Sequence, residues 1–366
     1  MKPFSAFFYI KQNKLRAGLI IFMYILTVSI YLAGLYISNI EGIFDNSIDK
    51  LKNFAILMPR ASDEGNVEFE RAVEMLKDNE KVTLLRQGYG NIYTKSIMGF
   101  NIGVMQYCFL SEEDFSVFCE YEGISLTKAE GKSNLEDGSV IMSELQANNR
   151  GMKLGGQLKI IESDEALYGD FYLNAITDEE GYCIYYINDM EADRYMILST
   201  GMTESEFRKF LTELKSEYHV FVCDREHYKE FIMSQIGSFH YIYFMVIVLT
   251  AITMAVTVNT AFAGMYQRRQ GEFALYKAIG IPRRKIKMKI VSEVVVMDII
   301  GIVIGMSILM LGIWLFNNLY LFEHGYHLFY YNKMALQGIV ISNVIVLVPV
   351  ILLQGRRLMK MDICDY

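Results

Sequence analysis

The stretch Tyr266–Lys289, which reads YQRRQGEFALYKAIGIPRRKIKMK, lies between two long apolar runs of the chain. It contains eight Lys and Arg residues and a single acidic residue, Glu272. Short loops of membrane proteins that are rich in Lys and Arg stay on the cytoplasmic side. The stretch therefore predicts a cytoplasmic loop, and this assignment sets the orientation of the whole chain.

The middle of this stretch predicts a short helix that is apolar on nearly all sides. From Glu272 to Ile279 the only charged residues are Glu272 and Lys277. Gly280 is placed to end the helix, and Pro282 cannot continue it. A helix that is apolar all round has to be buried against something. At the inner membrane surface the two candidates are the bilayer interface and a docked cytoplasmic protein.

The composition of the chain separates a membrane part from an acidic part. The chain has 366 residues, of which 52% are hydrophobic, and its mean hydropathy is +0.22. Such values are higher than a soluble domain usually needs. Residues 41–230 contain 36 Asp and Glu but only 19 Lys and Arg. This acidic balance excludes nucleic acid as the main partner of the region, and it suits a water-exposed domain that could attract cations.

Four apolar runs are long enough to cross a bilayer. The first is longer than the apolar part of a signal peptide, and no small-residue cleavage site follows it, so we expect it to be retained. Pro349 interrupts the last run. The predicted transmembrane helices are residues 17–40, 239–264, 291–319 and 335–354.

The remaining segments alternate between the two sides of the membrane. We expect a multi-pass protein of the cell (cytoplasmic or inner) membrane with both termini in the cytoplasm. The fold class is an α-helical membrane protein with four transmembrane helices and a large α+β extracytoplasmic domain between the first two. The predicted segments are a cytoplasmic N-terminus at 1–16, the extracytoplasmic domain at 41–238, a cytoplasmic coupling segment at 265–290, an outer loop at 320–334 and a cytoplasmic tail at 355–366.

The acidic domain shows short strand patterns mixed with helical ones, in one lobe or two. Ser111 with Asp114, and Thr203 with Glu206, have the spacing of a capping box. The expected strands are 54–58, 82–85, 158–161, 171–176, 183–187, 195–198 and 220–223. The expected helices are 66–77, 112–121, 143–149 and 204–217.

Polar and small residues inside the third span fall on one helical face. Asp298, Gly301, Gly305 and Gly312 are spaced at offsets that repeat along a helix. Small residues permit close approach of two helices, and a buried acid avoids lipid by pairing. We favour a packing or interface role over a proton relay. The residues predicted for transmembrane packing or a dimer contact are Asn259, Glu293, Asp298, Gly301 and Gly305.

Several kinds of chemistry are missing from the sequence. A phosphate-binding loop is not present, because Leu126 stands where the motif ending at Gly131-Lys132-Ser133 needs a glycine. His324 and His327 lack a third metal ligand. Cys108, Cys119, Cys183 and Cys223 in the acidic domain either form two disulfides or remain buried free thiols. We therefore expect no enzymatic activity, no catalytic residue and no metal or cofactor of its own.

The coupling segment resembles that of MacB/FtsX-type ABC transporter permeases (type VII, the mechanotransmission family). The similar residues are EFALYKAIG at Glu272–Gly280, the basic pair Arg283 and Arg284 with Ile286, and further on Glu293, Gly301 and Gly305. In that family the short helix docks on an ABC ATPase. The resemblance implies that the ATPase contact consists of Glu272, Phe273, Leu275, Tyr276, Lys277, Ile279 and Gly280.

A second resemblance lies in the acidic domain and concerns its folding. The residues EGK at 130–132, VIMSELQA at 140–147 and GMKLGGQLKI at 151–160 are similar to a signature of the MacB periplasmic core. This sequence departs from that signature at Gln146 and Gly156, where we expect only a small change at the surface. The interpretation is structural, with a strand leading into a helix capped by Ser143 and glycine turns leading to the next strand.

The resemblance implies a permease subunit that couples ATP hydrolysis by a separate ATPase to movement of its extracytoplasmic domain. The expected cargo of this export or extrusion is peptides, antimicrobials or lipoproteins. The alternative is an FtsX-like signalling subunit that regulates a cell-wall hydrolase or senses antimicrobial peptides. The implied partners are cytoplasmic ABC ATPase subunits, which bind the ATP and Mg, a second permease copy or paralogue, and membrane lipid, with no nucleic acid. A membrane-anchored enzyme is disfavoured by the missing catalytic residues.

Overall fold

The computed structural model describes residues 14–60, 63–97, 99–104, 106–131, 134–165, 167 and 169–360. Most of the predicted N-terminal segment, Lys132 and Ser133, and the end of the C-terminal tail with Cys364 lie outside these residues. The chain divides into two compact units. We call residues 1–38, 238–316 and 328–366 the helical unit, and residues 39–237 and 317–327 the sheet domain.

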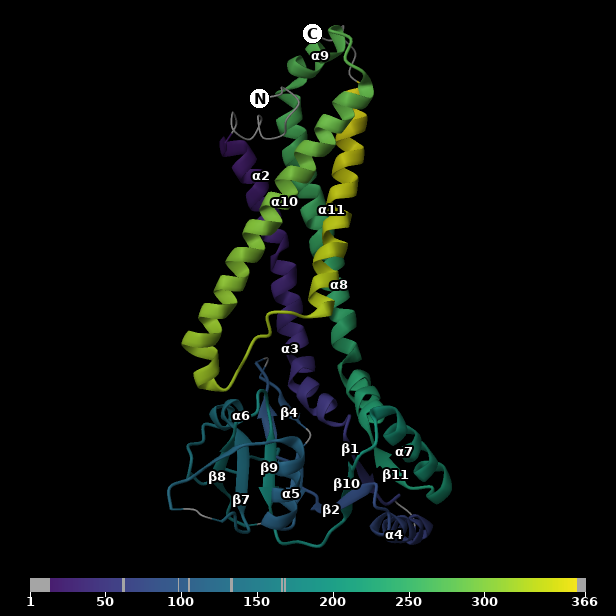
Figure 1. Cartoon of the computed structure of the whole chain (residues 1–366). Coiled ribbons are helices and arrows are strands. Elements are labelled where there is room, and N and C mark those ends of the chain that lie inside the picture. The colour runs from purple at the N-terminus through teal and green to yellow at the C-terminus, as the bar shows by residue number, and fades with distance from the viewer. Residues whose placement is uncertain are drawn as a thin grey trace. The chain divides into compact units, whose positions relative to one another are not determined.

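Within the described residues, four helical stretches are long and apolar enough to cross a membrane. They are Ala17–Ile37, Arg225–Gln267, Arg283–His324 and Lys333–Arg357. The helices that contain them are α2 (Lys14–Thr27) with α3 (Ser29–Lys50), then α8 (Arg225–Gln267), α10 (Arg283–Phe316) and α11 (Lys333–Lys360). In the helical unit, α10 packs against both α2 and α11 (Figure 1).

Two of the spans differ from the prediction in their continuity. The first is two helices rather than one, because the backbone tightens to a three-residue turn at Val28, whose N–H donates to the Ile25 carbonyl at 3.0 Å. The side chain of Ser29 adds a hydrogen bond to the Leu26 carbonyl. Conversely, Pro349 does not interrupt the fourth span, since α11 continues through it. Neighbouring helices let a transmembrane helix tolerate proline.

Glycines on α10 allow it to lie directly on α2. A methyl group on Gly301 would be 2.5 Å from Cβ of Tyr24, and one on Gly305 would be 2.6 Å from Cγ2 of Val28. Gly312, which the sequence placed on the same face, is exposed and has nothing within 4 Å of such a methyl group. The predicted close packing at Gly301 and Gly305 is thus satisfied within one chain, by α2.

The two kinds of glycine make a matched pair for a stability test. We expect Gly301→Leu to lower the free energy of unfolding by about 1–3 kcal/mol, because the added side chain overpacks the α2–α10 contact. Gly312→Leu gains the same helix propensity without a clash, so it should be neutral or slightly stabilising. Thermal unfolding of both variants in detergent measures the difference. Equal unfolding temperatures would contradict the close packing of α10 on α2.

The sheet domain is built on one sheet of nine strands, in the order β11-β1-β10-β2-β5-β9-β7-β8-β6. Its helices α4 (Asp63–Lys77) and α7 (Glu204–Tyr218) pack together near β2 and β11, and α6 (Glu144–Asn149) lies against β7 and β8 (Figure 1). The strands are β1 (Phe54–Met58), β2 (Val82–Gly88), β5 (Tyr107–Phe109), β6 (Leu126–Lys128), β7 (Ser139–Ser143), β8 (Tyr172–Thr177), β9 (Ile184–Ile187), β10 (Arg194–Ser199) and β11 (Phe221–Cys223). A separate pair is formed by β3 (Tyr93–Lys95) and β4 (Asn101–Gly103).

Local signals in the sheet domain are confirmed where their partners lie nearby in the chain. Thr203 and Glu206 form a complete capping box at the start of α7. Ser111 caps α5 (Glu112–Glu122) by accepting from the backbone N–H of Asp114, although the reciprocal bond is not made. Ser143 caps α6 in the same way. These bonds satisfy backbone donors that a helix leaves free at its N-terminus.

The predicted strand at residues 158–161 is wrong. The N–H of Leu158 still donates to the Phe171 carbonyl, next to an isolated bridge at Gln157, but beyond Leu158 side chains take backbone groups that a neighbouring strand would bind. Arg150 donates to the Lys159 carbonyl, and Asp164 accepts from the Ile161 N–H. Arg150 and Asp164 are themselves joined by a buried ion pair of 2.7 Å. Gln146, expected to change only the surface, is fully buried and accepts a hydrogen bond from Thr94.

The four described cysteines, Cys108, Cys119, Cys183 and Cys223, are all buried and free. The free-thiol alternative therefore applies, and the disulfide alternative does not. Burial raises the pKa of the Cys108 and Cys119 thiols to about 12. Thiols of this kind act as small apolar core residues and are unreactive.

The segment that follows α10 contains the first part of the outer loop predicted at residues 320–334, and residues 317–327 pack as part of the sheet domain. It begins with one turn of π-helix, η1 (Asn317–Leu321), and continues as η2 (Phe322–His324). Gly325 has φ +70°, and a methyl group there would be 1.9 Å from the backbone nitrogen of Asn149. Its carbonyl accepts from Nδ2 of Asn149 at 2.9 Å and from the hydroxyl of Tyr182 at 3.1 Å. Only glycine fits so close an approach.

Candidate functional site

The coupling segment forms α9 (Gln270–Ala278), a short helix between α8 and α10. It ends as the sequence predicted. Gly280 is left-handed, with φ +81°, and donates to the Lys277 carbonyl, while the N–H of Ile281 reaches the Tyr276 carbonyl at 3.0 Å. This pattern is a Schellman motif, which closes a helix and satisfies its last carbonyls. The next helix begins directly after Pro282.

The apolar residues of α9 divide into an inward and an outward set. Phe273 is 1% exposed and packs edge-on against Tyr266, inside a buried cluster of the helical unit. Leu275 and Ile279 are 57% and 68% exposed. Tyr276 is half-buried. The prediction that all these residues meet a partner therefore changes, because Phe273 anchors the helix from within, whereas Leu275 and Ile279 are the large apolar residues of this segment that are exposed to another surface.

A cluster of four charges fixes α9 and the turn before it to α10. Arg269 binds both Glu272 and Glu293 through paired bonds, the shortest of which is 2.7 Å to each carboxylate. Lys289 lies 3.0 Å from Glu272. The hydroxyl of Tyr276 donates to Glu272 at 2.7 Å. Glu293 is fully buried and Lys289 is 4% exposed, whereas the side chain of Glu272 is 33% exposed, so the two positive and two negative charges neutralise one another at a partly buried site.

This cluster shifts the acid–base properties of Glu272. Burial by itself raises the pKa of a carboxyl group, but hydrogen bonds from Arg269, Tyr276 and Lys289 outweigh it and lower the pKa of Glu272 to about 2. Burial opposes the charge on Arg269, yet its hydrogen bonds to Glu272 and Glu293 raise the pKa of the guanidinium group. The ordinary pKa of the Glu272 carboxyl is 4.5, so the folded state strongly favours its charged form.

The lowered pKa gives a pH prediction with a definite sign. A carboxyl whose pKa is depressed by folding stabilises the protein above its unfolded pKa and loses that effect as it is protonated. The stability difference between wild type and Glu272→Gln should therefore be constant above pH 4.5 and shrink as the pH falls toward about 2. Thermal unfolding of both proteins across this range measures it. If the stability difference stayed constant down to about pH 2, the assigned interactions of Glu272 in the charge cluster would be contradicted.

The remaining basic residues of the segment point outward. Five of the eight are exposed, whereas Arg269 and Lys289 are used inside the charge cluster and Lys277 is partly covered. Exposed lysines and arginines keep their attraction for an anionic lipid surface or an acidic protein. The exposed residues are Arg268, Arg283, Arg284, Lys285 and Lys287.

The residues predicted for transmembrane packing all have partners within this chain. Asn259 on α8 accepts from Nε2 of Gln354 on α11 through its carbonyl and its side chain, at 3.1 and 2.7 Å. Asp298 is 3% exposed and accepts from Nδ2 of Asn343 at 3.2 Å. The structure brings Glu293 to Arg269, as described above. A contact with a second chain is not needed to account for any of these residues.

Sequence reasoning missed Arg269, Lys289, Asn343 and Gln354 as partners. Arg269 carried a usable signal, because it precedes Glu272 by three residues, a spacing at which opposite charges pair on a helix. The others are joined to their partners only by tertiary packing.

His324 and His327 do not share a metal site in the described structure. The ring of His324 stacks on Tyr320, with the centroids 4.2 Å apart, and its Nδ1 lies 2.8 Å from the Tyr320 carbonyl. The carbonyl of His327 accepts from Nδ2 of Asn39. Among the residues described, no three His, Cys, Asp or Glu side chains are grouped closely enough to hold a metal ion.

Comparison with known proteins places the site within a recognised family segment. No curated protein matches the chain. Residues 243–363 match the family of the FtsX-like permease C-terminal domain. The matched residues include α9, the charge cluster and four residues predicted for transmembrane packing, which are Asn259, Asp298, Gly301 and Gly305. The C-terminal part of the chain is therefore similar to the FtsX-like permease C-terminal domain, and the described residues include four helical stretches that can span a membrane.

Proposed function

We propose that the chain is the permease subunit of an ABC transporter, energised by a separate ATPase that docks on α9. One observation carries the proposal. Leu275 and Ile279 are exposed on a short helix that Phe273 and the charge cluster hold in place. A fixed helix that presents large apolar side chains next to a basic surface is suited to binding a protein groove.

The proposed orientation follows from the same segment. The exposed basic residues around α9 favour the cytoplasm for this end of the helical unit. The sheet domain is then extracytoplasmic, and the docked ATPase lies inside. ATP hydrolysis would move the sheet domain through the spans, in the service of peptide, antimicrobial or lipoprotein export, with a second permease copy or a paralogue completing the assembly.

The proposal is tested by measuring ATP hydrolysis with and without the partner. The purified chain should be inactive alone, since its sequence lacks a phosphate-binding loop. Activity should appear in a complex with its partner ABC ATPase. The control is the ATPase carrying a substituted phosphate-loop lysine, which should abolish the activity of the complex. Hydrolysis by the pure chain, or failure to form the complex, would overturn the proposal.

A further inference from the structure

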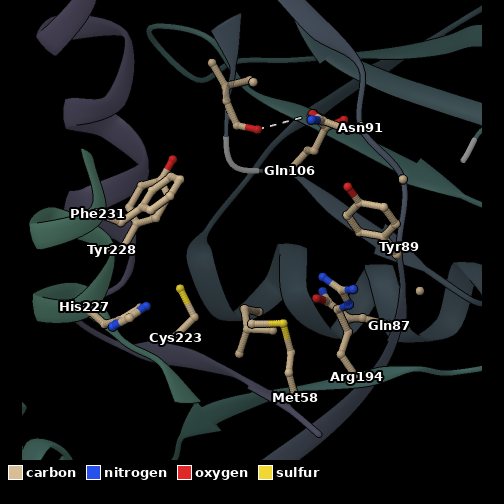
Figure 2. A pocket seen from close by; sticks show the side chains of 15 residues that line it. Met58, Gln87, Tyr89, Asn91, Gln106, Arg194, Cys223, His227, Tyr228 and Phe231 are labelled. Atoms are coloured by element: carbon tan, nitrogen blue, oxygen red, sulfur yellow. Dashed lines mark hydrogen bonds between the residues drawn. The ribbon is translucent and has the colours of Figure 1, made fainter. Parts of the chain in front are cut away.

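The sheet domain contains a pocket of about 390 Å³ between its strands and the first turns of α8 (Figure 2). This volume falls within the range of small-molecule sites. All of the lining residues belong to the sheet domain. Strands β1, β2 and β10 contribute Met58, Gln87 and Arg194, Tyr89 follows β2, and α8 contributes Tyr228 and Phe231.

One side of the pocket is apolar and aromatic. Tyr228 and Phe231 come from successive turns of α8 and lie across the pocket from Tyr89 (Figure 2). Phe231 is 51% exposed and Tyr89 is 40% exposed. Exposed aromatic side chains that converge on one cavity indicate a binding surface more strongly than isolated ones do. This side can accept a flat or aliphatic group.

The other side offers hydrogen-bond donors that are only partly used. Gln87 and Arg194 are directly opposite each other on neighbouring strands. Gln87 is 2% exposed, and the hydrogen bond of its side chain within the described structure is a weak one to sulfur, from Nε2 to Sδ of Met196 at 4.0 Å. A buried carboxamide normally has hydrogen-bond partners. Its position on the pocket wall allows a bound ligand to supply them.

Arg194 is held so that part of its guanidinium group stays available. Its Nε and Nη2 bind the carboxylate of Asp193, each at 2.9 Å, and the group lies 4.9 Å from the ring of Tyr89. Its Nη1 has no hydrogen bond within the described residues. None of the lining residues is acidic. The domain as a whole is acidic, but a ligand in direct contact with Arg194 would form a charge-assisted hydrogen bond, which is stronger than one between neutral groups.

We propose that this pocket binds a carboxylate ligand with an aromatic or aliphatic body. The carboxylate accepts hydrogen bonds from Nη1 of Arg194 and Nε2 of Gln87, while the body lies against Tyr228, Phe231 and Met58. Peptide C-termini and free organic acids share this chemistry. The site does not depend on the ATPase, so the test below is made without it, and its failure would not affect the proposed function.

A ligand in this pocket would also affect α8, because some of the lining residues belong to that helix. Tyr228 and Phe231 belong to the same unbroken helix whose later turns form the second span. A ligand that contacts both the strands and α8 would therefore favour one placement of this helix against the sheet. The pocket would then act as a sensor site, where binding of a molecule from the surroundings of the sheet domain changes the preferred position of the first turns of α8.

The experiment measures binding to the full chain in lipid nanodiscs by calorimetry, with three probes. N-acetyl-phenylalanine represents a peptide C-terminus, its amide lacks the carboxylate, and octanoate represents a free aliphatic acid. We expect saturable binding of at least one acid, and binding of the amide about tenfold or more weaker than its parent acid. The acid that binds more tightly shows whether the natural ligand is a peptide C-terminus or a free aliphatic acid. Absence of saturable binding by both acids, or equal binding of the amide, would overturn the proposal.

Two variants and a matched control locate the site. Arg194→Gln should weaken binding of the acid about tenfold or more, because a charged donor is lost. Arg71→Gln makes the same change at a residue of α4 with a 63% exposed side chain, and it should bind as wild type does. Phe231→Ala removes an exposed ring without disturbing the core and should also weaken binding. Wild-type affinity in both pocket variants would refute the assigned site.

Discussion

Replacing Arg269 by Met is expected to lower the free energy of unfolding of the helical unit by about 3–5 kcal/mol. The side chain binds both Glu272 and Glu293, at 2.7 Å each. Without it, the fully buried carboxylate of Glu293 loses its positive partner. Lys289 lies 3.0 Å from Glu272, the other carboxylate of the cluster. An uncompensated buried charge is among the most destabilising changes a protein can undergo.

Unfolding in a series of detergent mixtures measures this effect, with two further variants as controls. Arg284→Met makes the same substitution at an exposed residue of the same segment and should be nearly neutral. The double variant Arg269→Met with Glu293→Leu removes both buried charges and should recover most of the lost stability. If Arg269→Met were no worse than Arg284→Met, the charge cluster would not hold α9 in place.

The sequence predicted features whose causes lie within a few residues of one another. The end of α9 at Gly280 and Pro282, and the capping box of Thr203 and Glu206, follow from local backbone chemistry. The four apolar spans follow from length and composition alone. These features needed no knowledge of the tertiary fold.

The features that the sequence could not give depend on distant partners. The pairing of Arg269 with Glu293 joins residues on different helices. The irregular segment after Gln157 looked like a strand because its apolar pattern does not reveal that Arg150 and Asp164 take its backbone groups. In the same way, periodicity put Gly312 on the packed face, yet only Gly301 and Gly305 reach α2. The inward placement of Phe273 likewise required the structure.

Replacing Leu275 by Asp is expected to weaken ATPase association by about a hundredfold or more. Full burial of a leucine side chain contributes about 1.5–3 kcal/mol, and a charge left in an apolar groove adds a further penalty. Leu275 is 57% exposed in the free chain, so the substitution leaves the packing of α9 unchanged. The buried anchor Phe273 and the charge cluster should be unaffected. Unfolding of the purified variant should therefore match wild type.

The most direct test of the account is the amount of ATPase that copurifies with the tagged chain when the two proteins are expressed together. Val67→Asp is the matched control, because Val67 is 50% exposed on α4 in the sheet domain. With expression levels equalised, the account predicts that Val67→Asp retains the ATPase as wild type does and that Leu275→Asp loses it. Recovery of the ATPase with Leu275→Asp at the wild-type level would contradict the assignment of α9 as its docking site.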